Sequence, residues 1–287
     1  ADYVNQRSEL VAVDRFLFVR AERDAAAKKG KYNEFQREHY TPEQIAEVDQ
    51  AYANEFLRGA DTLHWEDVQE GEALPTMVKG PFTLTDVLAW MRGWGGGVHH
   101  SRLMWKHRQK HPKFYSLNDY GVPDVVERVH WEDAWARKIG NPTAYDFGRM
   151  RSCYLSQLVT NWMGDDAWLW KISNQFRQFN YHGDITWVKG KVVRKHIDTQ
   201  EHHLVELDIW CENQRGAVTA PGKATVILPS RDKGPVEIPK PSAEEILVAY
   251  QYHHIYHQNQ RANFEMHSLK FHQMNRYQTK QEYSNSA

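Results

Sequence analysis

The chain has 287 residues, with 36 lysines and arginines against 37 aspartates and glutamates, and a formal net charge of −1. This balance offers no basic field for a phosphate backbone, so the composition argues against nucleic-acid binding. No apolar run is long enough for a membrane span and no signal peptide opens the chain. The two cysteines, Cys153 and Cys211, do not indicate a disulfide framework, so we expect a cytoplasmic protein with reduced thiols.

Residues 1–60 are predicted to form a helical N-terminal extension. Thr41 is placed to act as an N-cap, Pro42 occupies the first helical position and Gln44 completes a capping box. Apolar residues then recur at helical spacing as far as residue 56. The segment is too polar to form its own core, so we expect it to lie against the main domain.

The main domain is predicted over residues 61–230, beginning with a short strand at Met77 and Val78. A capped helix follows after Thr83 and ends at the glycines of residues 93–97, because consecutive glycines cannot sustain a helix. The stretch near residues 95–129 is interpreted as an insertion. It contains a basic helix and then an irregular loop.

A long helix over about residues 147–163 is predicted next, and the apolar period then changes to two. Four antiparallel strands are expected between residues 168 and 228, with turns at 182–184 and 214–216. The first strand is expected to include Ile172, Phe176 and Phe179. A helix followed by such a meander favours an α+β fold in which the sheet wraps around the helix.

Residues 231–287 are predicted to form a linker and a C-terminal helical tail. Ser242 and Glu245 have the spacing of a capping box. The tail that follows is too aromatic for simple disorder, so we expect it to pack on the domain surface or on a partner subunit.

The stretch from His130 to the beginning of the long helix contains the candidate catalytic residues. An imidazole, a carboxylate and the free N–H groups of a helix start can together move protons beside a carbonyl and hold the developing charge. His130 is therefore the candidate general base, because its ordinary pKa suits proton transfer near neutrality. A buried structural histidine bonded to a carbonyl is the alternative.

The carboxylates and the glycine near His130 each have two interpretations. Asp133 could orient His130 or cap a short helix, and Asp146 could cap the long helix or supply a catalytic carboxylate. Asp124 and Glu127 are weaker candidates for the partner of His130. Gly148 would let a thioester carbonyl approach the amides of the helix start, or it is a packing glycine.

Four other histidines are alternative candidates for an active site or a metal site. His99 and His100 follow the glycine run and could be substrate-binding or active-site imidazoles in a different alignment. His253 and His257 have the spacing of metal ligands, but no third ligand accompanies them. The glycine run lacks the Gly-Lys-Ser/Thr of a phosphate loop. We therefore expect no metal and no cofactor.

The order His-x-x-Asp-x-x-Ala-Arg-x-x-Gly from His130, then Tyr-Asp-x-Gly from Tyr145, and then a long helix ending in Trp-Met-Gly-Asp, resembles the MaoC-type acyl dehydratases. These enzymes include the R-specific enoyl-CoA hydratases. Residues 180–190 are similar to that family's turn between strands, and residues 65–71 resemble its opening. The resemblance covers roughly residues 63–230.

The resemblance implies a hotdog fold, a dimer or double hotdog, and a pantetheine thioester held at a subunit interface. It also implies a catalytic pair of Asp and His, with the His in an Asn-Pro-x-His motif. This sequence departs from the motif, because Glu127, Arg128 and Val129 precede His130. The Gly-Asp that usually follows the first helix is replaced by glycines 95–97.

On this basis the chain is expected to be a hydro-lyase, an enoyl-CoA hydratase or 3-hydroxyacyl dehydratase, that works as a homo-oligomer. His130 and a carboxylate would move the protons, the N–H of Gly148 would stabilise the enolate, and Tyr145, Trp162 and Met163 would line the acyl pocket. Thioester hydrolysis on the same fold is one alternative. A non-catalytic acyl-binding subunit is another, favoured by the missing Asn-Pro and the aromatic tail.

Overall fold

The computed structural model describes residues 2–7, 9–17, 36–94, 101–248, 250, 251 and 258. The chain divides into two units, residues 1–20 with 239–287, and residues 21–238. The four histidines weighed above as alternative sites lie outside the described residues: His99, His100, His253 and His257.

The first unit begins with a hairpin of two strands, β1 (Asp2–Val4) and β2 (Leu10–Val13), paired antiparallel. The helix predicted for this part of residues 1–60 is therefore wrong. The Asn5 side chain explains the difference, because its Oδ1 accepts from the amides of Arg7 (2.9 Å) and Glu9 (3.0 Å) and closes a turn. In the same unit, the Ser242–Glu245 capping box is present.

The second unit opens with α2 (Pro42–Ala53), which the capping box predicted correctly. The Thr41 N–H donates to Gln44 Oε1 at 2.9 Å, and the Gln44 N–H donates to Thr41 Oγ1 at 3.3 Å. Val48 packs with Val78 and Ile185, so this helix lies against the edge of the sheet.

The sheet of the second unit has five antiparallel strands in the order β3-β7-β8-β9-β6. Their bounds are β3 (Met77–Lys79), β6 (Trp168–Asn174), β7 (Thr186–Ile197), β8 (His203–Asn213) and β9 (Val218–Ile227). Strands β7, β8 and β9 form the predicted meander. Strand β6 instead pairs with β9 at the far edge. This strand order, with a long helix between β3 and β6 along the chain, is that of the hotdog fold.

The first of the four predicted strands is shorter than expected. It ends at Asn174, so Phe176 and Phe179 lie in the loop that follows. The loop is needed because β6 and β7 are separated by two other strands, and the chain must cross the end of the sheet between them. Two backbone hydrogen bonds hold the loop against β9: the Gln175 N–H donates to the Pro221 oxygen (2.9 Å), and the Arg177 N–H donates to the Thr219 oxygen (2.9 Å).

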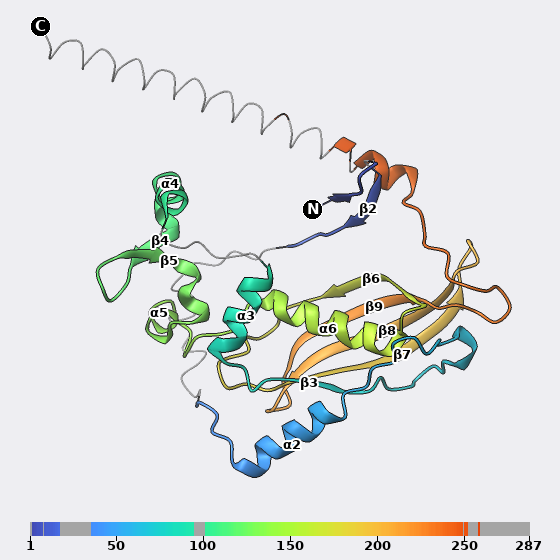
Figure 1. Ribbon diagram of the computed structural model, residues 1–287, viewed down its shortest axis with the longest axis horizontal. Coiled ribbons are helices and arrows are strands. Elements are labelled where there is room, and N and C mark those ends of the chain that lie inside the picture. The colour runs from blue at the N-terminus through green and yellow to red at the C-terminus, as the bar shows by residue number, and fades with distance from the viewer. Residues whose placement is uncertain are drawn as a thin grey trace, which may run out of the picture. The chain divides into compact units, whose positions relative to one another are not determined.

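Helix α6 (Gly148–Met163) lies across the curled sheet (Figure 1). Its apolar stripe packs on the inward residues of the strands, and each fully buried side chain of this kind contributes roughly 1.5–3 kcal/mol. The central members of this core are Leu155, Leu158, Val159, Trp162, Val188, Leu207, Ile209 and Val226. The α+β architecture expected from the change of period is confirmed.

A short 3₁₀ helix at Trp65–Asp67 precedes β3. Between β3 and α6 the chain forms α3 (Leu84–Trp94), α4 (Arg102–Lys110) and α5 (Asp133–Lys138), with short 3₁₀ helices at Pro112–Phe114 and Val126–His130. The stretch predicted to be an irregular loop contains a small sheet of β4 (Tyr115–Leu117) and β5 (Pro123–Val125). Met104, Tyr115, Val125 and Trp131 pack together and give this insertion its own small core. None of the described helices is both long and apolar enough to cross a bilayer.

Candidate functional site

His130 ends the 3₁₀ helix Val126–His130, and its ring lies at the beginning of α6. Its Nδ1 is 2.8 Å from the backbone oxygen of Tyr145. Because a carbonyl oxygen can only accept, Nδ1 carries the hydrogen and the lone pair of the neutral ring lies on Nε2. The backbone of the residues before α6 thus selects the tautomer that a general base requires.

Aromatic rings surround the imidazole. The Phe147 ring lies 3.7 Å from it between centroids, and the Tyr145 ring meets it edge-on at 4.9 Å. Burial lowers the pKa of His130 to about 4, although hydrogen bonds to the backbone of Tyr145 and Asp146 act in the opposite direction. The ring is therefore neutral near pH 7, as a proton acceptor should be.

The beginning of α6 has no side-chain cap. Phe147 is the N-cap residue and accepts no hydrogen bond with its side chain, so the cap predicted for Asp146 is absent. The positive end of the helix dipole therefore lies beside the His130 ring, and among the described residues no carboxylate caps it. An oxyanion there would be favoured.

Gly148 is the first residue of α6. A Cβ at this position would lie 3.1–3.2 Å from atoms of the Phe176 ring. The glycine therefore lets the 175–185 loop pack against the helix start, a structural reason that is independent of any ligand.

Asp133 does not contact His130 through a hydrogen bond. Its carboxylate accepts from Thr143 Oγ1 (2.5 Å) and from the Ala144 amide (2.9 Å), and it pairs with Arg37. The N-cap of α5 is Glu132, so Asp133 is not the cap either. Asp133 instead positions the segment directly before Tyr145, the acceptor of the His130 hydrogen bond.

Asp146 is 3% exposed and forms an ion pair with Arg151, with 2.8 Å between Oδ2 and Nε. Burial raises the pKa of this carboxyl, and Arg151 opposes the rise. Arg151 also donates to the backbone oxygens of Gln178 (2.7 Å) and Thr219 (3.1 Å). The pair ties α6 to the loop after β6, and both groups are occupied by this structural role.

His182 is a site residue that the sequence analysis did not select. Its Nε2 donates to the backbone oxygen of His130 at 3.0 Å, and its amide donates to the Ala144 oxygen at 3.1 Å. Burial lowers the pKa of this half-buried ring. The only signal in the sequence is its place in the predicted turn of residues 182–184, which gives no indication of a contact with His130.

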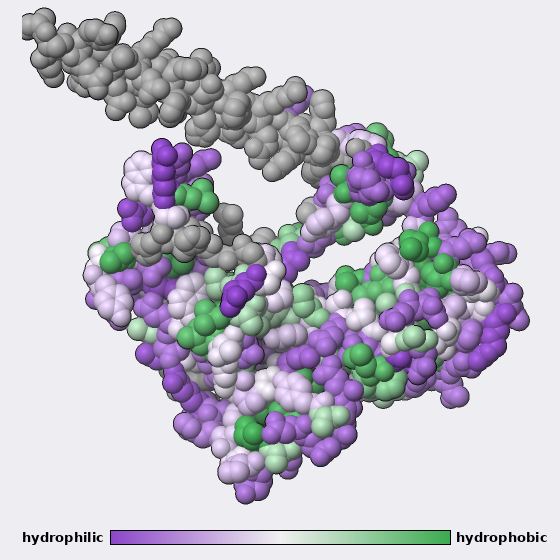
Figure 2. Space-filling view, viewed as in Figure 1, coloured by the Kyte–Doolittle hydropathy of each residue, from purple (hydrophilic) through white to green (hydrophobic). Residues whose placement is uncertain are grey.

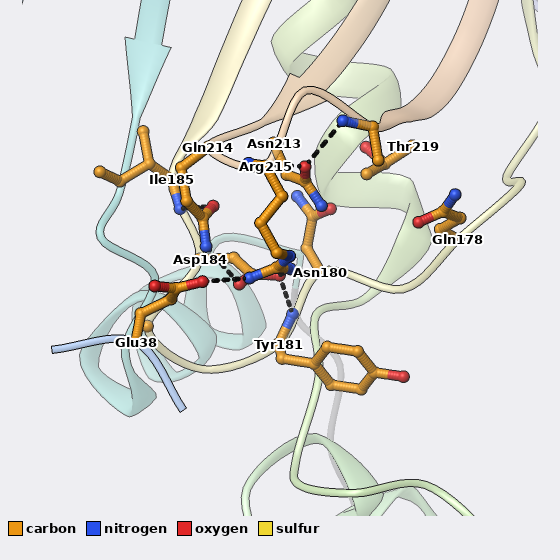
Figure 3. Close-up of polar contacts among 12 residues, drawn as sticks. Glu38, Gln178, Asn180, Tyr181, Asp184, Ile185, Asn213, Gln214, Arg215 and Thr219 are labelled. Atoms are coloured by element: carbon orange, nitrogen blue, oxygen red, sulfur yellow. Dashed lines mark hydrogen bonds and ion pairs between the residues drawn. The ribbon is translucent and has the colours of Figure 1, made fainter. Parts of the chain in front are cut away.

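The turn that carries His182 is held rigidly by Asp184, which is 1% exposed (Figure 3). Its carboxylate accepts from the Tyr181 amide (2.9 Å), Gln214 Nε2 (2.9 Å) and Arg215 Nη2 (2.8 Å). Arg215 also pairs with Glu38 at 2.6 Å, which attaches the segment before α2.

Several predicted site residues are not brought to His130. Trp162 and Met163 belong to the main core, and Trp162 is about 21 Å along the helix from Gly148 at 1.5 Å per residue. Asp124 accepts from Asn118 (3.2 Å) and from the Val125 amide (2.7 Å). Glu127 is half-buried, and burial raises the pKa of its carboxyl. In the described part of the chain, no cluster of three or more His, Cys, Asp or Glu side chains could hold a metal ion.

Comparisons with known proteins give no match to a family model and none to a curated protein. Solved structures do match. The (R)-hydratase from A. caviae involved in PHA biosynthesis is 17% identical, with a TM-score of 0.41 over 57% of this chain and 99% of that chain. R-hydratase PhaJ1 from Pseudomonas aeruginosa is 15% identical, with a TM-score of 0.42 over 63% of this chain and 94% of that one.

A MaoC-like dehydratase from Rhodospirillum rubrum is 14% identical, with a TM-score of 0.42 over 59% of this chain and 99% of that chain. The chain is thus similar to R-hydratases and MaoC-like dehydratases, and the strand order around α6 is that of the hotdog fold.

Proposed function

We propose that the chain is a hydro-lyase that adds water to, or removes it from, the α,β bond of an acyl-CoA-type thioester. The observation that supports it is the tautomer of His130, whose Nδ1 donates to the Tyr145 carbonyl beside the uncapped beginning of α6. In this proposal a proton acceptor and the positive end of the α6 dipole act on one thioester.

In hydration, Nε2 of His130 takes a proton from water while the water oxygen bonds to the β-carbon. The electron pair of the double bond moves toward the thioester carbonyl, and the amide of Gly148 stabilises the enolate oxygen. The protonated His130 then returns its proton to the α-carbon. Dehydration is the reverse sequence.

His130 serves for both proton movements in this proposal. Among the described residues no carboxylate is hydrogen-bonded to its ring, and the two expected partners are engaged elsewhere. Asp133 binds the 143–144 backbone and side chain, and Asp146 is paired with Arg151. An imidazolium with a pKa of about 4 is a strong enough acid to return the proton.

The test is to mix the protein with enoyl-CoA esters and follow loss of the conjugated thioester together with formation of the 3-hydroxyacyl product. Release of free CoA thiol without a hydroxylated product would instead identify a thioesterase. The mass of the protein in solution should be measured in parallel, since we propose a homo-oligomer.

A non-catalytic acyl-binding subunit is the second candidate. The observation that favours it is the engagement of both carboxylates away from His130, which differs from the Asp–His pair that the resemblance implies. Binding of acyl-CoA without turnover, or turnover only after a partner chain is added, would select this candidate.

The pH dependence of turnover follows from the burial of His130. The base form is the neutral ring, which persists as the pH falls until the pKa of about 4 is reached. We therefore expect kcat/KM to stay level from about pH 8 to about pH 5 and to fall below that. A decline centred near 6.5, the ordinary pKa of histidine, would show that the ring is solvated rather than desolvated.

A further inference from the structure

Helix α4 carries a row of positive charge in a chain whose formal net charge is −1. Arg102, Lys106 and Lys110 recur every four residues, so they share one face of the helix, and all three are exposed. Residues 101–113 contain no aspartate or glutamate. Within the described ranges none of the three forms an ion pair. Figure 2 shows strongly hydrophilic residues gathered over α4.

The stability of the helix does not explain this row. Like charges four residues apart repel one another, and Arg102 in the first turn opposes the helix dipole. The opposite face is the one that packs, since Met104 is 2% exposed in the core of the insertion. The outward face also holds Trp105, which is 52% exposed. An anionic ligand with a flat ring would neutralise the row and cover this side chain.

The row belongs to the same unit as the candidate site. The inner face of α4 packs on Trp131, the residue after His130. A ligand that reacts beside His130 and also reaches the outer face of α4 must be long, and it must carry its negative charge at the far end. An acyl-CoA has this form, with the thioester at one end of the pantetheine arm and the phosphates and adenine at the other.

We propose that Arg102, Lys106 and Lys110 bind the phosphates of the CoA headgroup, with its adenine stacked on Trp105. This inference rests on the proposed function for the identity of the ligand. It gives the insertion a substrate-binding role that the sheet and α6 do not supply.

The test compares the full chain with the triple variant Arg102→Gln, Lys106→Gln, Lys110→Gln. Binding of CoA is measured by calorimetry at low salt. Each exposed ion pair with a phosphate changes the dissociation constant by a factor of a few, so losing all three should raise the dissociation constant about tenfold. Because exposed charges are screened, the difference between the two proteins should shrink at high salt. The matched control neutralises three exposed cations of β7 and β9, Lys191, Arg194 and Lys223, and should bind CoA like the wild type.

A second arm uses an enoyl-pantetheine thioester, which lacks the phosphates and the adenine. The row variant should turn over this substrate as fast as the wild type, while its kcat/KM for enoyl-CoA falls about tenfold. Unchanged CoA binding in the row variant would overturn the inference, as would equal losses with both substrates. A loss confined to an acyl group carried on an acidic protein would also overturn it and would make the row a protein-docking surface.

Failure of the proposed function gives a different result. In that case neither thioester is hydrated by the wild type. CoA binding and its loss in the row variant would still be measurable.

Discussion

Replacement of His130 by alanine is expected to lower kcat/KM for enoyl-CoA hydration by about 10²- to 10⁴-fold, because general acid–base catalysis contributes on this scale. The Nε2 lone pair is the only part of the ring that the proposed chemistry uses. Steady-state rates with one enoyl-CoA substrate measure the loss, and equal rates for wild type and variant would exclude His130 as the base.

The matched control is His130→Asn. An asparagine amide can still donate to the Tyr145 carbonyl, so it should keep most of the roughly 1 kcal/mol that this hydrogen bond contributes to stability. It has no basic nitrogen, so it should be as inactive as the alanine variant. If asparagine restores activity while alanine does not, the role of residue 130 is to hold the backbone before α6.

The largest effect on stability is expected from Arg151→Met, which should lower the free energy of unfolding by about 3–5 kcal/mol at neutral pH. The substitution leaves the Asp146 carboxylate buried without its cation, and the backbone oxygens of Gln178 and Thr219 each lose the hydrogen bond from Arg151. Denaturant unfolding of the two proteins gives the difference.

Two further variants separate the charge from the packing. Arg151→Met combined with Asp146→Asn should recover part of the loss, since no uncompensated charge is then buried. Arg231→Met removes a cation from the exposed pair with Asp67 and should leave the free energy of unfolding nearly unchanged, because water screens this pair. Similar losses for Arg151→Met and Arg231→Met would mean that the Asp146–Arg151 pair is solvated.

The candidate site was predicted only in part, and the reason is the distance over which its contacts form. His130 and the beginning of α6 are close in sequence and carry a motif, so both were identified. His182 is far from His130 in sequence and reaches it only because the turn before β7 folds back. Asp133 binds Arg37, again a contact between remote segments. No pattern of neighbouring residues in the sequence predicts such partners.

Local signals in the sequence were sufficient to predict several of the helices and strands. The capping box at Thr41 and the apolar stripe of α6 act within a few residues, and the alternation along β7, β8 and β9 marks each strand separately. The pairing of β6 with β9 could not be predicted from local signals, because a strand can pair with any exposed strand edge that folding brings beside it. The tertiary structure also decided the roles of the carboxylates, since a charged group is stabilised by whichever donors surround it after folding.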